Sequence, residues 1–323
     1  MGRCFSNIYI ADKQLSIDSS GHFINFAYQE CLKILVRVDG WRYLLLLQNY
    51  DLVIKSVKET VEIYEMLNGV NDVAIRYCSD IRCSQVADQH RWDAKSLHIF
   101  KNESAATRSQ LNAKFNFAKG SAQASLSRAA VEWMVNTVNL TRLLYQLNRK
   151  ETYGVDELLI PSLQVSDDLD MPGRFTSKCL QNAIFIPGIT RFSFWYNTKC
   201  GCPSGTSRNG ICILGIEDLE VLSKSYNLIA NKVLPTFDYA VVDCIHEIIF
   251  NKTHGGVKHV LDLQHYRELV HVEFHKQRLR SYSDDKVICV SNSSFLLPIS
   301  TRPNTAVLES GVYMLSPQRL SNT

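Results

Sequence analysis

The chain has 323 residues, 46% of them hydrophobic, and a formal net charge of +3 at pH 7. This length and apolar content suffice for one large domain, or two small ones, with a buried core. The charge is too small to indicate a nucleic-acid-binding protein. The sequence also lacks a Lys/Arg block and a basic patch interleaved with aromatic residues.

Cysteine content and glycosylation sequons indicate the secretory pathway. The chain has ten cysteines, more than a cytosolic enzyme of this size usually carries. Four N-x-S/T sequons are candidate glycosylation sites: Asn102, Asn139, Asn251 and Asn292. The N-terminus has no apolar run of signal length, and the longest apolar run, within Tyr43–Leu47, is too short to cross a bilayer. We expect either a cytosolic protein of unusual composition or, as we favour, a chain that lacks its natural start.

The first part of the chain predicts alternating strands and helices. We predict strands over residues 5–11 and 41–48 and a helix over residues 22–38, whose apolar residues recur on one face. The second strand ends at Asn49-Tyr50-Asp51. The order of strand, loop and helix indicates α/β layering, in which ligands bind beyond the carboxyl ends of strands.

A second helix is predicted from its end signals. Ser56 and Glu59 have the spacing of a capping box, and Asn68-Gly69 is a typical C-terminal cap. The following residues, 70–119, have no clear periodicity. Cys78 and Cys83 are close enough in sequence for a local disulfide, whereas a metal site would need more ligands nearby.

The centre of the chain combines a long helix pattern with a pair of carboxylates. Ser127 is a plausible N-cap, and apolar residues recur at helical spacing from there to about Leu147. Asp156 and Glu157 then follow Gly154 at the start of a new apolar segment. Either these acids cap a helix start, where they suit the helix dipole, or one of them is a general base held on a rigid element.

Two further segments contain candidate binding residues. Residues 191–196, RFSFWY, include aromatic side chains that can stack on sugar faces or pack in a core. Cys200, Cys202 and Cys212 lie close together in sequence, so a zinc site is conceivable. No fourth ligand follows at a standard spacing, which argues against zinc.

Several ordered motifs resemble one known family. The segments GSAQASLSR and YGVDELLIPSLQ, the following Pro172-Gly173 pair and the block from Cys200 to Lys232 are similar to the core-2/I-branching β-1,6-N-acetylglucosaminyltransferases of glycosyltransferase family 14. The similarity extends from about residue 4 to about residue 255. It implies an α/β fold of the GT-A type, a Rossmann-like mixed sheet flanked by helices, without the first part of the nucleotide-binding region. We expect residues 1–255 to form a partial catalytic domain and residues 256–323 its C-terminal extension.

The resemblance also implies an activity. The family transfers N-acetylglucosamine from UDP-N-acetylglucosamine to a 6-hydroxyl of a glycan acceptor, with inversion and without a metal or other cofactor. The expected partners are a nucleotide sugar and a glycan or glycoprotein, and the expected location is the Golgi membrane or lumen. Family members are type II membrane proteins, although no anchor is apparent in this sequence. The alternatives are a xylosyltransferase-like member and a catalytically inactive glycan-binding protein.

Individual site residues follow from the resemblance. Glu157 falls on the catalytic base of the family, and Trp195 on a residue that contacts the acceptor sugar. Arg208 and Lys232 fall on the Arg and Lys that neutralise the leaving diphosphate. Asp168–Asp170 has the form of an Asp-x-Asp metal motif, but its position matches a connecting loop of the family.

Further assignments concern the first segments and the cysteines. Asp51 and Lys55 fall on an Asp and a Lys of the family; the alternatives are a loop acid and a solvated lysine near a helix start. Cys202 and Cys212 match a cysteine pair that forms a disulfide in the family. Three other cysteines would lack their family partners and are expected to be free thiols: Cys4, Cys31 and Cys244.

Overall fold

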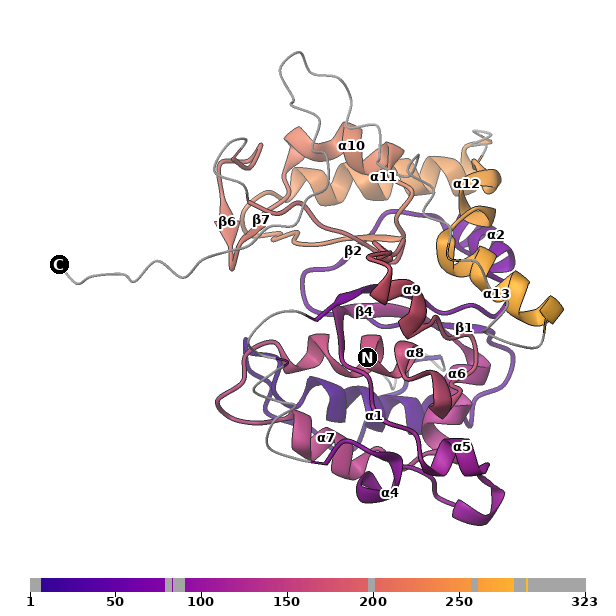
Figure 1. The fold of residues 1–323 in the computed structure, drawn as a ribbon. Helices are drawn as coiled ribbons and strands as arrows, with labels where there is room; N and C mark the ends of the chain where they lie inside the picture. Colours follow the sequence, from indigo (N-terminus) through magenta and orange to yellow (C-terminus); the bar gives the residue numbers. More distant parts are fainter. Residues whose placement is uncertain are drawn as a thin grey trace. The chain divides into compact units, whose positions relative to one another are not determined.

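The computed structural model describes residues 7–78, 83, 91–196, 201–256, 261–281 and 289 (Figure 1). These residues belong to one unit that spans Met1–Val290. Helices and short strands are mixed along the chain, and the described strands form three small sheets. The predicted α/β class is confirmed.

The first sheet has a ten-residue strand at its centre. This strand, β4 (Ala118–Ser127), lies between β1 (Tyr43–Leu45) and β3 (Asp72–Tyr77) and is antiparallel to both. The helix α8 (Leu159–Val165) packs against β3 and β4, and all its residues are buried (Figure 1). The hydroxyl of Ser162 in α8 accepts a hydrogen bond from the backbone N–H of Ala118 and donates one to its C=O, so this buried polar group is satisfied within the core.

The helix predicted from Ser127 is interrupted. Ser127 does cap a helix, accepting a hydrogen bond from the amide of Ala130, but this helix, α6 (Arg128–Glu132), gives way to a π-helical turn, η2 (Trp133–Thr137). The next residue then forms a β-bridge with Phe100 before α7 (Thr141–Leu147) begins. Most of the apolar residues in this stretch are buried on both sides of the break. Periodicity alone therefore could not reveal the interruption.

Two early elements are shorter than predicted, and one is wrong. Residues 7–11 form no strand. The first helix, α1 (Ile24–Leu35), begins after Phe23, which has a left-handed backbone conformation with φ of 64°, and not at His22. The strand predicted over residues 41–48 is reduced to β1, whose three residues lie opposite residues 125–127 of β4.

A second sheet brings three distant segments together. Its central strand, β8 (Ile229–Ala230), pairs antiparallel with β2 (Leu52–Val53) and parallel with β5 (Arg191–Phe192). A separate apolar cluster joins this sheet to α10 (Leu219–Lys224) and α11 (Ala240–His254). The residues next to these strands therefore become neighbours although they are far apart in sequence.

A two-stranded hairpin forms the third sheet. Its strands β6 (Ser207–Arg208) and β7 (Ile211–Cys212) are joined by Asn209 and Gly210, with φ of 54° and 76°. Positive φ at both turn positions is typical of a type I′ hairpin and favours Asn-Gly. A short 3₁₀ turn, η5 (Ile216–Asp218), then leads into α10.

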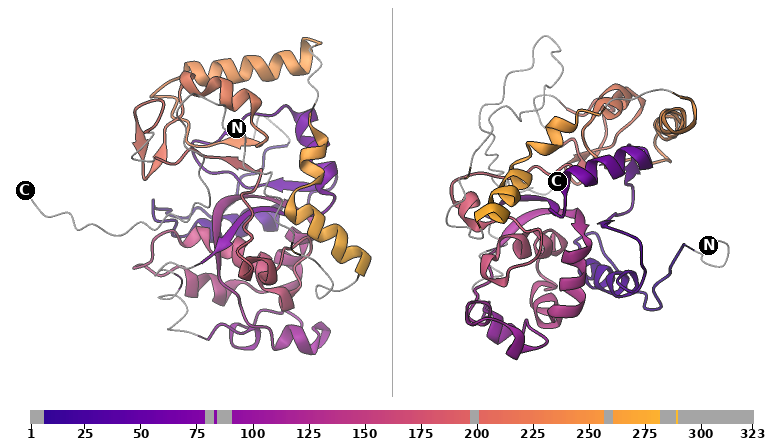
Figure 2. Two further views of the ribbon diagram at one scale, coloured as in Figure 1. Left: turned by 45° about the horizontal axis from the view of Figure 1, so that its top comes forward. Right: turned by 90° about the vertical axis from the view of Figure 1, so that its right-hand side faces the viewer.

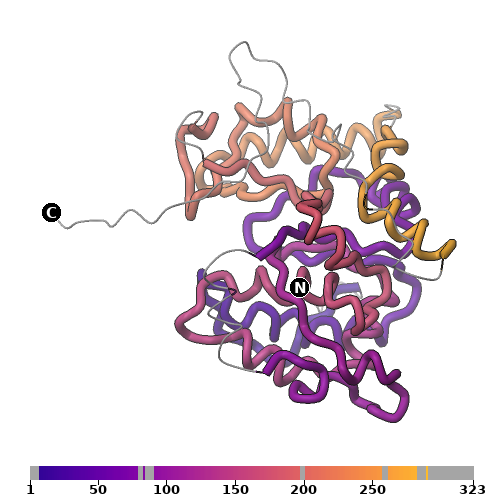
Figure 3. Tube along the Cα trace, in the orientation of Figure 1, coloured from indigo at the N-terminus to yellow at the C-terminus, as the bar shows by residue number. Residues whose placement is uncertain are grey.

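The last described helices pack beside an early one. The helix α2 (Val57–Leu67) has the predicted capping box and ends at Asn68, as predicted. The later helix α12 (Leu263–Arg267) lies against α2 and is followed by α13 (Val270–Ser281) (Figures 2 and 3). His271 of α13 pairs with buried Asp72 at 3.0 Å, so α13 is joined to the first sheet.

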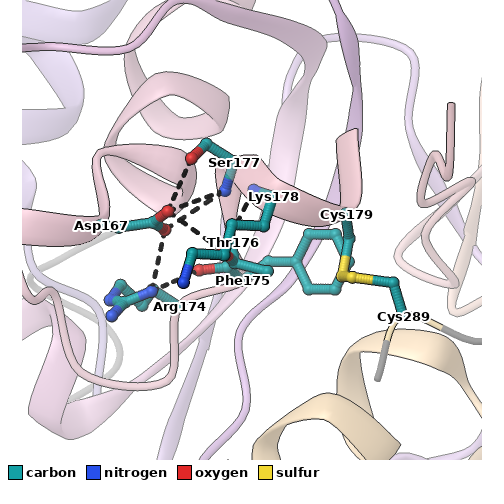
Figure 4. The surroundings of a disulfide bond; sticks show 8 residues. All are labelled: Asp167, Arg174, Phe175, Thr176, Ser177, Lys178, Cys179 and Cys289. Atoms are coloured by element: carbon teal, nitrogen blue, oxygen red, sulfur yellow. Dashed lines mark hydrogen bonds and ion pairs between the residues drawn. A yellow bond between two sulfur atoms is a disulfide. The ribbon is translucent and has the colours of Figure 1, made fainter. Parts of the chain in front are cut away.

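Short helical turns complete the described elements. They are α4 (Ala94–Leu97), η1 (Glu103–Ala105), α5 (Arg108–Leu111), η3 (Val155–Glu157), η4 (Asp167–Leu169) and α9 (Ser177–Gln181). Figure 4 shows how η4 holds α9: the Asp167 carboxylate accepts hydrogen bonds from Thr176 and Ser177 and pairs with Arg174 at 2.9 Å. The acidic stretch Asp168–Asp170 thus lies in a connecting turn, where its last carboxylate pairs with Arg174 and Arg278.

Three disulfides join described cysteines. Cys78 bonds to Cys83, five residues away, Cys202 before the hairpin bonds to Cys212 in its second strand, and Cys179 of α9 bonds to Cys289 (Figure 4). Nothing in the sequence singled out the last pair. Within the described ranges, no helix is long and apolar enough to span a membrane.

Candidate functional site

Glu157 lies on a short rigid turn beside the first sheet. Gly154, with φ of 70°, begins η3, and its amide donates a hydrogen bond to the carbonyl of Ser20 at 2.7 Å. The Glu157 carboxylate is 3.3 Å from Nζ of Lys119, a buried residue of β4, and its side chain remains 29% exposed. Both acids lie in the first turn of η3, where acids suit the helix dipole, although α8 itself has no side-chain cap. The two interpretations of this acid pair therefore both stay predictions.

Asp156, the neighbour of Glu157, is buried. Its carboxylate accepts a hydrogen bond from the Gln48 amide at 3.0 Å. Burial, and then the negative charge of Glu157, raise the pKa of Asp156 to about 6. Gly21, with φ of +85°, packs so closely that a Cβ there would lie 2.0 Å from this carboxylate. The turn is therefore enclosed on the Asp156 side and open on the Glu157 side.

A network of amides holds Asp51 beside this turn. Its carboxylate accepts hydrogen bonds from Asn231 Nδ2 at 2.7 Å, from Gln123 Nε2 at 3.1 Å and from the backbone of Gln48 at 2.6 Å. Burial raises the pKa of Asp51 above its ordinary value, opposed by these hydrogen bonds. Asp51 follows β1, Gln123 lies on β4 and Asn231 follows β8, so both larger sheets contribute to the network.

Arg191 of β5 is the cation in this network. Its Nη1 donates to Gln123 Oε1 at 3.1 Å and to Ser121 Oγ at 3.3 Å. Burial lowers the pKa of Arg191, while the charges of Asp51, Glu157 and Asp156 act in the opposite direction. In the sequence, Arg191 belongs to the segment 191–196, which was notable only for its aromatic residues. Nothing in the sequence indicated the charged neighbours of Arg191.

Lys232 interacts electrostatically with both Arg208 and Arg191. Burial lowers the pKa of Lys232, and the positive charges of Arg208 and Arg191 lower it further, whereas Asp51 opposes the shift. Arg208 is exposed on the hairpin, with its guanidinium carbon 5.8 Å from the centre of the Tyr50 ring. The two cations suggested by the sequence are therefore near enough to repel each other, and Arg191 is a third member of the group.

The site thus combines carboxylates with cations, and Arg191 interacts electrostatically with members of both groups. Comparison with known proteins identifies the family of the chain. The family model "Core-2/I-Branching enzyme" matches residues 1–223, more than half of the chain. The chain belongs to the Core-2/I-branching enzyme family.

Named relatives carry one enzyme description. The chain is 26% identical over 268 residues to the beta-1,3-galactosyl-O-glycosyl-glycoprotein beta-1,6-N-acetylglucosaminyltransferase of Bovine herpesvirus 4. It is 26% identical over 272 and 266 residues to the corresponding enzymes 3 of Mus musculus and Ovis aries. Each alignment covers 79% of this chain and 58% of the relative. The chain therefore spans less than two thirds of the length of these relatives.

In this Core-2/I-branching chain, Trp195 is exposed beside the hairpin. The side chain is 58% exposed and forms part of an aromatic run with Phe194 and Tyr196. Its backbone makes a β-bridge with Ile211 of β7, and its ring faces Gly210 in the turn. Trp195 and Arg208 are thus attached to the same hairpin.

Lys55 lies outside the site of this Core-2/I-branching chain. It is only 3% exposed, and its ammonium donates to the carbonyl of Ser225. Burial lowers the pKa of Lys55 to about 8. The nearby pair of Glu59 and Lys252, 2.9 Å apart, joins α2 to α11. The interpretation of Lys55 as a solvated lysine is wrong, because the folded chain encloses it.

The cysteines and sequons of the Core-2/I-branching chain have the following positions. Cys202 and Cys212 form the disulfide that the resemblance implies, which removes both from a zinc site. Cys31 and Cys244 are free thiols, as expected, and Cys4 lies outside the described residues. The side chains of two sequon asparagines, Asn102 and Asn251, are exposed, and that of Asn139 is half-buried. Asn292 lies outside the described residues, and glycosylation of all four remains a prediction.

Proposed function

We propose that this chain transfers N-acetylglucosamine from UDP-N-acetylglucosamine to the 6-hydroxyl of a galactose- or N-acetylgalactosamine-type glycan acceptor. The observation that carries the proposal is the presence of carboxylates and cations in one site. Glu157, a partly exposed carboxylate, lies beside buried Asp156, and both act on the charge of Arg191; Arg191 and Arg208 in turn act on the charge of Lys232. A glycosyl transfer needs a base on the acceptor side and positive charge on the leaving-group side.

Glu157 has the role of general base. In the proposed step it takes the proton of the acceptor 6-hydroxyl, while the hydroxyl oxygen forms a bond to the anomeric carbon. The bond between that carbon and the diphosphate oxygen breaks, and its electron pair leaves with UDP. Attack opposite the leaving group inverts the anomeric centre. Lys119, 3.3 Å from the carboxylate, holds Glu157 in the orientation for this proton transfer.

Arg208 and Lys232 stabilise the departing diphosphate. Two cations that repel each other in the free protein are stabilised when an anion binds between them. Their N–H groups also supply charge-assisted hydrogen bonds to phosphate oxygens. We therefore propose a reaction without a metal ion, in which these side chains neutralise the charge that a divalent ion neutralises elsewhere.

Trp195 is the proposed acceptor contact. Its ring is largely exposed and belongs to the same hairpin region as Arg208. An exposed aromatic face can stack on the C–H surface of a sugar. We place the protein in the Golgi membrane or lumen, which is supported by its disulfides, since such bonds persist in oxidising compartments.

The test is transfer of labelled N-acetylglucosamine from UDP to a mucin-type disaccharide by the 323-residue chain secreted from cells. Glu157→Gln should lower kcat by roughly 10²–10⁴-fold, because it removes the base, with donor affinity little changed. Glu132→Gln is the matched control: Glu132 also pairs with a cation, Arg128 Nε at 2.7 Å, but on α6. Its activity should remain at the wild-type level.

Three outcomes would contradict parts of this proposal. A Glu157→Gln variant with the wild-type rate removes Glu157 from the role of base. Faster transfer from UDP-xylose than from UDP-N-acetylglucosamine indicates the xylosyltransferase-like alternative. A wild-type chain that binds acceptor glycan without turnover indicates the inactive glycan-binding alternative.

A further inference from the structure

The guanidinium of Arg191 is fixed along one side only. Nη1 donates to Gln123 Oε1 and Ser121 Oγ, and the Ser121 hydroxyl in turn donates to Gln123 Oε1 at 2.8 Å. Gln123 is almost completely buried and donates to Asp51 with its amide nitrogen. Neutral groups of β4 therefore hold Arg191 in place without neutralising its charge.

The opposite edge of the guanidinium is not engaged by any described residue. In the part of the chain that the structure describes, no residue accepts a hydrogen bond from Nε, which is buried, or from Nη2. These two nitrogens form the edge with which arginine binds a carboxylate or phosphate through two parallel hydrogen bonds. A buried donor without an acceptor is unfavourable, so a ligand that supplies two adjacent oxygens would be stabilised here.

The charges around Arg191 indicate what kind of ligand fits. Asp51, Asp156 and Glu157 attract the guanidinium, yet Arg191 makes no direct ion pair with a described carboxylate. Lys232, in turn, is close enough to be repelled by both Arg191 and Arg208. A neutral sugar would leave this repulsion in place, whereas a phosphate group would relieve it.

Arg191 and Lys232 also lie on adjacent stretches of backbone. β5 runs parallel to β8, with Arg191 opposite Ile229, and the amide of Asn231 donates to the carbonyl of Phe192 at 2.9 Å. Lys232 follows directly after Asn231. The two cations are thus carried by neighbouring parallel segments of one sheet, which gives Arg191 a rigid support.

We propose that Arg191 is a third cation of the diphosphate site and binds a phosphate oxygen pair of a nucleotide diphosphate through its Nε/Nη2 edge. This inference rests on the proposed function, in which Arg208 and Lys232 hold the diphosphate. Arg191 also donates to Gln123, whose amide donates to Asp51. The same guanidinium would therefore bind the diphosphate and interact with the carboxylates of the site.

The experiment measures binding by the 323-residue chain with isothermal titration calorimetry, using UDP and inorganic diphosphate as probes. Arg191→Gln removes the positive charge and the Nε/Nη2 edge, and should lower the affinity for both probes by roughly ten- to a hundredfold. Arg191→Lys keeps the charge but cannot form the two parallel bonds, so its loss should be intermediate. Arg142→Gln, which alters an exposed arginine bonded to the carbonyl of Ser96, should bind both probes like the wild type.

The possible results separate this inference from the proposed function. Thermal unfolding establishes that each variant is folded. If Arg191→Gln does not fold, the affinity of Arg191→Lys tests the role of Arg191. Wild-type affinity in the Arg191 variants, with clear binding by the wild type, overturns the role of Arg191 and leaves the proposed function intact. A wild-type chain that binds neither UDP nor inorganic diphosphate overturns the diphosphate site itself, and with it both proposals.

Discussion

Asp156 and Glu157 are consecutive residues with different surroundings. Asp156 points into the protein toward Gln48, whereas Glu157 is partly exposed beside Lys119. Two carboxyl groups in unlike environments titrate differently, which is how neighbouring acids acquire separate roles. In this chain Asp156 is held by its hydrogen bond to Gln48, and Glu157 is the acid that remains partly exposed.

The buried charge of Asp156 should cost folding stability at neutral pH. Its pKa is raised from 3.8 to about 6, so between these values the folded protein retains a proton that the unfolded chain has lost. Stability therefore falls as pH rises from about 4 to about 6, and the cost, at most about 3 kcal/mol, is constant at higher pH. Asp156→Asn should unfold at a higher urea concentration than the wild type at pH 7.5, with the difference vanishing near pH 4.

The control for this prediction is an exposed acid. Asp39 is fully exposed, so Asp39→Asn should alter stability little and without the same pH dependence. If the stability difference between Asp156→Asn and the wild type is equal at pH 4 and pH 7.5, burial does not raise the pKa of the Asp156 carboxyl.

At this scale the sequence identified the site residues that stand in recognisable motifs and missed those that depend on strand pairing. Glu157 and Lys232 stand in motifs whose spacing can be recognised, and the structure places both in the charged group. Arg191, Gln123 and Lys119 were missed, because their importance depends on which strands lie side by side. A single arginine or glutamine carries no local pattern that distinguishes a site residue from any other.

Helix ends were the elements that the sequence predicted most reliably. The Ser56–Glu59 capping box forms as expected, with the Glu59 carboxylate accepting the Ser56 amide at 2.8 Å and the Ser56 hydroxyl accepting the Glu59 amide at 3.2 Å. Such signals depend on residues three apart, so they do not require knowledge of the fold. Strand lengths do depend on the fold, and the strand expected over residues 41–48 was correspondingly overestimated.

The Ser56 cap gives a prediction for α2. Ser56→Ala should lower the free energy of unfolding by about 1 kcal/mol, because the Glu59 amide loses a buried hydrogen-bond partner. Urea denaturation measures this loss. Thr107→Ala removes the equivalent cap of α5, a four-residue helix without buried residues, and should cost less. Equal losses in the two variants would indicate that burial does not contribute to the value of the Ser56 cap.

At the scale of the whole molecule, a long-range disulfide joins Cys289 to the core. Its partner, Cys179, is buried on α9, and 110 residues separate the two cysteines. Closing so long a loop restricts the unfolded chain far more than the five-residue separation of Cys78 and Cys83 does. The pair also connects the end of the described chain to the first sheet through α9.

Cys289→Ser should therefore lower the free energy of unfolding by roughly 2–5 kcal/mol. The remaining thiol of Cys179 can stay buried as a small apolar group, so the loss reports chiefly on the cross-link. Urea denaturation of the oxidised protein gives the value, with Cys31→Ser, which alters an exposed free thiol, as the control expected to be near zero. Wild-type stability of the Cys289→Ser variant would contradict a stabilising role of the cross-link.

The sequence by itself determined the α/β class, the family, the helix caps and the identity of the base and its two cations as candidates. These depend on local spacing or on ordered motifs, which a linear sequence contains in full. Only the tertiary structure decided that the helix from Ser127 breaks, that Lys55 is enclosed, and that Arg191 interacts electrostatically with both Glu157 and Lys232. Each of these depends on contacts between segments far apart in the chain, because burial and charge interactions follow distance in space and not separation in sequence.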